Sequence, residues 1–184
     1  MNSGRVLTCF KSYDVRGKLG DEFNPEIAYR IGRAIVETLG AKTLVLGFDA
    51  RKTSAALAQS IALGICEAGA DVIEIGLAGT EEMYAAVSEF NASGGIEVTA
   101  SHNPIDYNGM KIVKHGSQPL SANEFASIQH IAEENKFSLP QNTGLAINKK
   151  SEATAGLNKN SGCHSRFRNE SNSFWRLPRP QHRS

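Results

Sequence analysis

The sequence predicts an α/β protein, a three-layer α/β/α sandwich whose sheet is mostly parallel or mixed. Segments with helical and with strand periodicity alternate along the chain and are joined by short connections, an order typical of sheets covered by helices on both faces. Residues 43–48 form a nearly continuous apolar run that ends at Asp49, as a strand buried on both faces should. The length of 184 residues suits one domain with an appendage.

Each predicted element has a local signal. An apolar run at 6–10 indicates a first strand leading into a polar loop at 13–17. Asn24-Pro25-Glu26 supplies an N-cap, a proline at the first helical position and an acidic first turn, and Gly40 ends that helix. Helical spacing predicts two further helices, at 54–68 and at 80–90, the second with Thr80 as its cap. A last helix should follow the capping box Ser121–Glu124, with an apolar face of Phe125, Ile128 and Ile131. Further strands are predicted at 71–75, 95–99 and 110–114.

The charge distribution divides the chain near Pro140. Residues 1–140 carry 12 Lys/Arg and 17 Asp/Glu, whereas residues 141–184 carry 8 and 2. The second part has few apolar residues and no sustained period, so it cannot offset the entropy of ordering. We therefore predict a folded domain at 1–140 and a basic, low-complexity, disordered tail at 141–184.

Composition also excludes several classes of protein. No uncharged apolar run approaches the roughly 18 residues that span a bilayer, and the first ten residues lack the apolar stretch of a signal peptide. We expect a cytoplasmic protein without membrane contact. Three widely spaced cysteines argue against a disulfide framework or a CxxC metal site. Cys9 and Cys66 lie in apolar stretches and are predicted to be small buried hydrophobes.

Four polar loops at predicted strand ends are the candidate site: 13–17, 49–54, 99–104 and the approach to Lys111. Ligands collect at the carboxyl ends of strands in open α/β sheets. If these loops share one rim, they bring together Arg16, Arg51, Ser101, His102, Asn103 and Lys111. Arginine forks, a lysine charge and a serine hydroxyl suit a phosphate group. The alternative is that Ser, Asn and Pro at 99–104 are ordinary turn formers. The common nucleotide-binding loops GxxxxGK[ST] and GxGxxG are absent.

Three motifs carry a resemblance to a known family. Residues 99–104 (Thr-Ala-Ser-His-Asn-Pro) with 107–111 (Tyr-Asn-Gly-Met-Lys) resemble the active-site loop of the α-D-phosphohexomutases. Residues 13–17 (Tyr-Asp-Val-Arg-Gly) resemble the family's N-terminal loop, and 47–51 (Gly-Phe-Asp-Ala-Arg) its Gly-x-Asp-x-Arg motif. The resemblance spans roughly residues 5–140. Residues 94–98 and 79–82 are most similar to the bacterial phosphomannomutase type.

The resemblance implies a phosphoryl shuttle between a serine and a hexose phosphate. Ser101 matches the family's phosphoserine, which donates to a hexose monophosphate to give a bound bisphosphate, and the other phosphate then returns to the serine. By position, Lys111 matches a lysine near the transferring group, with an acid–base or electrostatic role. The resemblance also implies that Arg16 and Tyr13 approach the phosphoserine, that His102 and Asn103 shape its loop, and that Asp49 and Arg51 either brace the loops or touch substrate.

Much of the family's machinery has no counterpart in the sequence. Members have four domains, and the resemblance places their Mg²⁺ on an Asp-Gly-Asp-x-Asp loop of the second domain. No Asp-x-Asp occurs here, so only a phosphate oxygen on Ser101 would be a metal ligand, and Mg²⁺ prefers six. The sugar-recognition and phosphate-clamping loops of later domains are absent too. We therefore expect negligible mutase turnover unless other chains supply these parts.

Other hypotheses stay open at this point. The α/β core could be a binding module for a phosphorylated sugar without activity, whereas the basic tail is too weak a signal to indicate nucleic-acid binding. The chain could be an inactive remnant that self-associates through an exposed domain interface. The change in composition after Pro140 also fits translation out of frame, which sequencing of the coding region would test. The preferred sugar, mannose or glucose phosphate, is not determined by these residues.

Overall fold

The computed structural model describes residues 6–138, 140 and 142–149. The four α-helices of this part are α1 (Pro25–Leu39), α2 (Ser54–Glu67), α3 (Thr80–Glu89) and α4 (Ala122–Glu134). The strands are β1 (Val15–Lys18), β2 (Thr43–Phe48), β3 (Asp71–Leu77), β4 (Gly94–Val98), β5 (Tyr107–Lys114), β6 (Gln118–Pro119) and β7 (Ala146–Asn148). A short 3-10 turn, His115–Ser117, follows β5.

The strands form one mixed sheet in the order β1-β5-β4-β2-β3-β7, and β6 pairs with β5. β2 is parallel to β3 and β4, and β3 is parallel to β7. β5 runs antiparallel to β1, β4 and β6. The loop after β4 therefore lies at the same end of the sheet as the carboxyl end of β2. The predicted mixed α/β sheet is confirmed.

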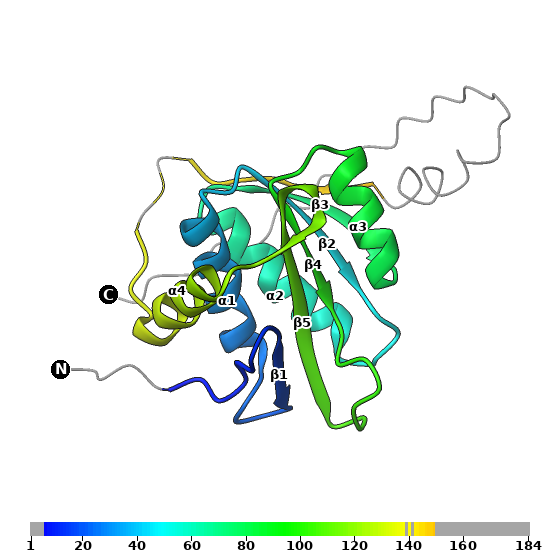
Figure 1. Ribbon diagram of the computed structural model, residues 1–184, viewed down its shortest axis with the longest axis vertical. Coiled ribbons are helices and arrows are strands. Elements are labelled where there is room, and N and C mark those ends of the chain that lie inside the picture. Colours follow the sequence, from blue (N-terminus) through cyan, green and yellow to red (C-terminus); the bar gives the residue numbers. More distant parts are fainter. Residues whose placement is uncertain (1–5, 139, 141, 150–184) are drawn as a thin grey trace, which may run out of the picture.

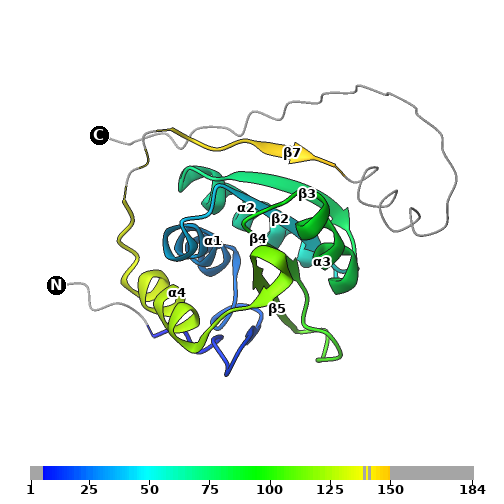
Figure 2. The same cartoon turned by 45° about the horizontal axis from the view of Figure 1, so that its top comes forward.

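Helices cover both faces of this sheet (Figures 1 and 2). α1, α2 and α4 share one large apolar core with the strands, and α3 packs on the other face with a smaller core. Along β5, Met110 and Ile112 belong to the large core and Val113 to the small one, because successive side chains of a strand point to opposite faces. The three-layer prediction is thereby confirmed.

Close backbone packing joins α1 to α2. A Cβ on Gly64 would lie 2.3 Å from the carbonyl oxygen of Tyr29, and one on Gly32 would lie 2.7 Å from that of Ile61. Only hydrogen fits at these two positions, so the helices approach at their glycines and bury apolar side chains on either side.

The predicted caps hold with one exception. Asn24 Oδ1 accepts a hydrogen bond from the Ile27 amide, and Gly40 ends α1 with φ of 57°. The Ser121–Glu124 capping box starts α4. The exception is α3, where the N-cap is Gly79, whose amide donates to the Glu82 carboxylate, and Thr80 is the first helical residue.

The first strand begins at Val15, five residues after the end of the run 6–10 where the sequence predicts it. Residues 6–9 form no strand, Phe10 makes a single bridge to Val15, and β1 lies within the expected loop 13–17. The apolar residues Leu7 and Cys9 are buried in the large core without strand pairing. The hydrophobicity of Leu7 and Cys9 therefore reflects their burial in the core. Residues 15–18 form a strand instead because they pair with β5.

The sheet also continues beyond Pro140, where the sequence predicts no further structure. β7 adds three residues parallel to β3 at the edge. All three side chains are exposed, so no apolar alternation marks the strand. The rest of the predicted tail, 150–184, lies outside the described residues. Cys9 and Cys66 are buried as predicted, and burial raises the pKa of the Cys9 thiol to about 12. No helix in the described ranges is long and apolar enough to cross a membrane.

Candidate active site

The segment 99–106 connects β4 to β5 at the lower end of these strands in Figure 1. Arg51, from the loop that follows β2, holds its backbone. The guanidinium Nη1 donates to the carbonyls of Pro104 and Tyr107 at 2.8 and 3.1 Å. Nη2 donates to those of Ser101 and Asn103 at 2.8 and 2.6 Å. One side chain therefore fixes four carbonyl groups, and we call this arrangement the Arg51 clamp.

Ser101 occupies a strained position inside the clamped segment. Its φ of 54° lies in the left-handed region, which is uncommon for residues other than glycine, asparagine and aspartate. The amide of Ser101 donates to Thr99 Oγ1 at 2.9 Å, and its hydroxyl lies 3.2 Å from His102 Nδ1. The residue is exposed. The loop therefore presents the Ser101 hydroxyl to solvent on a backbone that other groups hold in place.

Asn103 and His102 make their contacts within the same loop. The Asn103 amide and side-chain Nδ2 both donate to the carbonyl of Ala100, at 3.1 and 2.9 Å. These bonds close a tight turn around Ser101. His102 is exposed, and no further described residue hydrogen-bonds its side chain in a way that would make it a proton relay.

A second layer of polar groups supports the Arg51 clamp. Asp49 Oδ1 accepts hydrogen bonds from the Arg51 amide at 3.0 Å and from Ser54 Oγ at 2.5 Å. Asp49 Oδ2 lies 3.5 Å from Arg51 Nε. Asn108, which is fully buried, donates to Ser54 Oγ and to Thr53 Oγ1 at 2.9 Å each. In this structure Asp49 and Arg51 brace the two loops.

The support from Asn108, Thr53 and Ser54 was missed by sequence reasoning. Asn108 lies inside the Tyr-Asn-Gly-Met-Lys motif, and a buried amide requires partners, so its presence in a strand was a usable signal. Thr53 and Ser54 carry no such signal, because serine and threonine are common at helix starts whatever else they contact.

Arg16 and Lys111 lie on the sheet face that α3 covers in part. Arg16 is opposite Gly109 in the β1–β5 register, and Lys111 is two residues further along β5. Val15 and Met110 point into the large core, so Arg16 and Lys111 point to the other face. Diagonal neighbours of this kind have Cα atoms about 7–8 Å apart. The two cations are therefore adjacent, half-buried groups.

The expected single rim is only partly formed. The loops at 49–54 and 99–106 are joined by the Arg51 clamp, but the first motif is displaced along β1. Lys18 and Leu19 contact Asp106, through an ion pair of 3.4 Å and a hydrogen bond of 2.8 Å. Tyr13 lies at the other end of β1 and is 84% exposed. Arg16 pairs with Asp14 at 2.7 Å. No hydrogen bond among the described residues joins Arg16 or Lys111 to Ser101.

The described residues do not form a site that suits Mg²⁺. They contain no group of three or more His, Cys, Asp or Glu side chains placed to hold a metal ion. Mg²⁺ demands near-ideal octahedral oxygen coordination, and Ser101 would contribute a single phosphate oxygen. We therefore derive no step through a metal from these residues.

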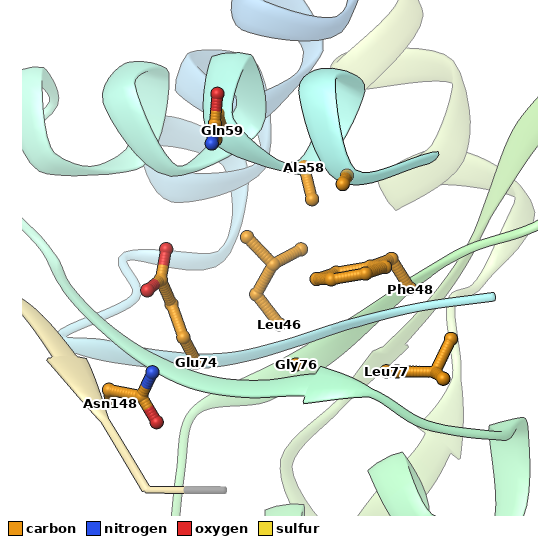
Figure 3. A pocket seen from close by; sticks show the side chains of 9 residues that line it. Leu46, Phe48, Ala58, Gln59, Glu74, Gly76, Leu77 and Asn148 are labelled. Carbon is orange, nitrogen blue, oxygen red and sulfur yellow. The ribbon is translucent and has the colours of Figure 1, made fainter. Parts of the chain in front are cut away.

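A separate hollow of about 290 Å³ lies between α2 and the strands β2, β3 and β7 (Figure 3). It contains neither Ser101 nor Lys111. Its lining is mostly apolar and comprises Leu46, Phe48, Ala55, Ala58, Gln59, Glu74, Gly76, Leu77 and Asn148. Burial raises the pKa of the Glu74 carboxyl in this lining.

Comparison with known proteins agrees with this fold. Residues 8–139 match the family described as phosphoglucomutase/phosphomannomutase, alpha/beta/alpha domain I. The chain is 55% identical over 134 residues to a phosphomannomutase of Escherichia coli K12, covering 72% of this chain and 29% of that protein. A phosphomannomutase of Klebsiella pneumoniae is 54% identical over 132 residues, which cover 71% of this chain and 84% of the relative.

A solved structure supports the same relationship. The crystal structure of a phosphoglucomutase/phosphomannomutase family protein from Burkholderia thailandensis is similar with a TM-score of 0.70 and 28% identity. The match covers 80% of this chain and 34% of that one. The chain therefore spans about a third or less of the length of most of these relatives.

A mixed sheet between helical layers, with an exposed serine on a clamped loop after a central strand, defines an α/β/α domain of the phosphohexomutase class. Within that class, the chain belongs to the phosphoglucomutase/phosphomannomutase family and corresponds to its domain I.

Proposed function

We propose that this chain provides the phosphoserine domain of a phosphomannomutase-type enzyme, in which Ser101 carries the phosphoryl group between mannose 1-phosphate and mannose 6-phosphate. The observation that carries the proposal is the Ser101 geometry: an exposed hydroxyl on left-handed backbone that Arg51 holds through four carbonyls. The identity to bacterial phosphomannomutases supports the choice of sugar. A cytoplasmic place of action is part of the proposal.

The transfer step needs positioning and charge stabilisation. The Ser101 Oγ–phosphorus bond forms while the phosphorus–oxygen bond of a hexose bisphosphate breaks, and the serine proton passes to the leaving sugar oxygen. The Arg51 clamp fixes the direction of the hydroxyl, and such positioning contributes up to roughly 7–11 kcal/mol to transfer reactions. Lys111 and Arg16, which the family resemblance assigns to this site, are the cations that would offset charge on the equatorial phosphate oxygens.

The chain's own share of the reaction is the half-step at Ser101. About two thirds of the length of these relatives lies outside the matched region, and electrostatic donors of the kind expected there contribute about 3–4 kcal/mol each. We therefore expect phosphorylation of Ser101 by a bisphosphate donor, and negligible turnover of mannose 1-phosphate by this chain alone.

Intact-protein mass spectrometry tests the proposal. The full chain is incubated with mannose 1,6-bisphosphate and Mg²⁺ and examined for one added phosphoryl group. Wild type and Ser117→Ala should gain it, and Ser101→Ala should not. Ser117 is the matched control because it is another serine with positive φ in a loop of this domain. Uptake that persists in Ser101→Ala, or no uptake in any protein, would overturn the proposal.

A further inference from the structure

Glu97 is a buried carboxyl group without a hydrogen-bond partner. It lies in the middle of β4, four residues before Ser101, and is 1% exposed. Neither side-chain oxygen receives a hydrogen bond from any described residue. Buried polar groups are paired in the great majority of cases, and an unpaired one needs an explanation. The sequence indicated this segment as a strand and as part of the family resemblance, without a role for Glu97 itself.

The surroundings of Glu97 are built to hold the side chain in place. A Cβ on Gly47 would lie 2.4 Å from Glu97 Oε2, so the glycine of the 47–51 motif leaves the space that the carboxyl occupies. Gly95, on the same face of β4, lets Met83 and Val87 of α3 pack directly on the strand. α3 thereby covers this face of β4 and keeps water from the Glu97 carboxyl.

The charges facing Glu97 disfavour its ionised form. Asp49, Glu82 and Glu81 are the acidic groups close enough to repel a charge there. Lys111 is its register partner on β5, but no ion pair joins the two within 4 Å. Burial first, and then repulsion by these acids, raises the pKa of the Glu97 carboxyl to about 8. At neutral pH the group is therefore mostly an uncharged acid.

Glu97 is linked to the Ser101 loop through Asp49. Asp49 orients Arg51 by accepting from its amide and lying beside its Nε, and Arg51 holds the four carbonyls of the loop. A second negative charge at Glu97 would repel Asp49. The protonation state of Glu97 therefore acts on the group that orients the clamp.

We propose that Glu97 is a positioning residue for the Ser101 loop, which keeps the Arg51 clamp closed as an uncharged carboxylic acid and loosens it when the proton is lost. Its importance for catalysis rests on the proposed function, whereas its effect on the loop does not. A regulation of phosphoryl uptake by pH follows, with uptake decreasing on the alkaline side.

Nuclear magnetic resonance of the full chain tests the link directly. The side-chain carboxyl carbon of Glu97, the Arg51 Nε–H and the amides of Ser101 and Asn103 are followed from pH 5.5 to 9.5. We expect all four signals to titrate with one midpoint near pH 8 in wild type. In Glu97→Gln, which keeps the shape and the neutral state, the loop signals should lose this transition and keep their low-pH positions throughout.

Glu74→Gln is the matched control. Glu74 is another partly buried carboxyl with a raised pKa, but it points into the hollow beside α2 on the opposite face. Its replacement should leave the loop titration unchanged. The proposal is overturned if Glu97 titrates near pH 4–5, if it titrates without the loop, or if the loop keeps the same midpoint in Glu97→Gln. If Glu97→Gln does not fold, the test rests on wild type alone, in which the Glu97 carboxyl and the loop signals should titrate with the same midpoint.

Phosphoryl uptake separates this proposal from the proposed function. The initial rate of Ser101 phosphorylation by mannose 1,6-bisphosphate should decrease about five- to tenfold from pH 7 to pH 9 in wild type and less than twofold in Glu97→Gln. Equal decreases in both proteins would overturn a catalytic role for Glu97. No uptake at any pH would instead overturn the proposed function and leave the loop titration to decide whether Glu97 controls the clamp.

Discussion

The two faces of the sheet differ in how they are built. The face covered by α1, α2 and α4 buries an extended apolar core, and two glycines let α1 and α2 touch through their backbones. The face covered by α3 has a smaller apolar core and also encloses Glu97, whose carboxyl has no described partner. The core of the first face is apolar, whereas the second face buries a whole carboxyl group beside its apolar core.

This difference suggests separate roles for the two faces, one in the stability of the domain and one in the response of the Ser101 loop to pH. An unpaired buried carboxyl costs free energy in its ionised form, so selection for stability alone would replace it with an apolar residue. It lies on the strand that leads to Ser101, and groups with perturbed pKa values gather at functional sites. Under our proposal, the large face supplies most of the packing that stabilises the domain, and the small face makes the loop sensitive to protons.

The largest expected effect is a pH-dependent loss of stability caused by Glu97 on the small face. The folded pKa of Glu97 is about 8, against about 4.3 for an unfolded glutamate. Its stabilisation is therefore complete below the unfolded pKa and is lost progressively as pH rises from there through the folded value of about 8, a difference of about 5 kcal/mol at most. Urea unfolding of wild type and Glu97→Gln across this range should show wild type losing stability relative to the variant. Parallel pH profiles would contradict this account.

On the large face, Gly64→Ala should break the contact between α1 and α2. The new Cβ would meet the carbonyl oxygen of Tyr29 at 2.3 Å, and overpacking of this kind costs about 3 kcal/mol. Urea unfolding should report that loss without any new dependence on pH. Gly79→Ala is the control, because its Cβ meets only ordinary contacts and the change should cost less than about 1 kcal/mol. Equal losses would show that backbone proximity is not the cause.

The Arg51 clamp itself provides the next effect. Arg51→Ala removes four hydrogen bonds to the Ser101 loop, and we expect a loss of about 2 kcal/mol together with faster amide exchange at Asn103. Lys18→Ala is the control, since Lys18 makes an exposed ion pair with the same loop, a contact worth less than about 1 kcal/mol. Unchanged amide exchange at Asn103 in Arg51→Ala would show that Arg51 does not hold the Ser101 loop in place.

The smallest expected effect is a loss of stability at the start of α4, which packs at the edge of the large face. Ser121→Ala removes the N-cap of α4, whose hydroxyl accepts from the Glu124 amide, and should cost about 1 kcal/mol in thermal or urea unfolding. Ser60→Ala is the control within α2, where the hydroxyl donates to a helical carbonyl and no cap is lost. It should change stability by less than about 0.5 kcal/mol.

Local signals were sufficient for most elements. Asn24, Gly40 and the Ser121–Glu124 box act within a few residues, so the ends of α1 and the start of α4 could be predicted. The apolar run of β2 likewise showed burial on both faces. The run at 6–10 was misread because apolar residues are buried by packing as well as by pairing, and β7 was missed because an exposed three-residue edge strand has no pattern.

The amino-acid sequence by itself determined the α/β class, the main helices and the serine loop, because periodicity, caps and motifs are properties of neighbouring residues. Only the tertiary structure decided how the loop is held. Arg51 reaches carbonyls about fifty residues away, and Asn108 supports Ser54 across the β5–α2 contact. The same holds for Glu97, an ordinary glutamate in sequence that becomes an uncharged acid when Gly47, α3 and Asp49 surround it. Burial and charge depend on which distant segments meet, and that is set by packing.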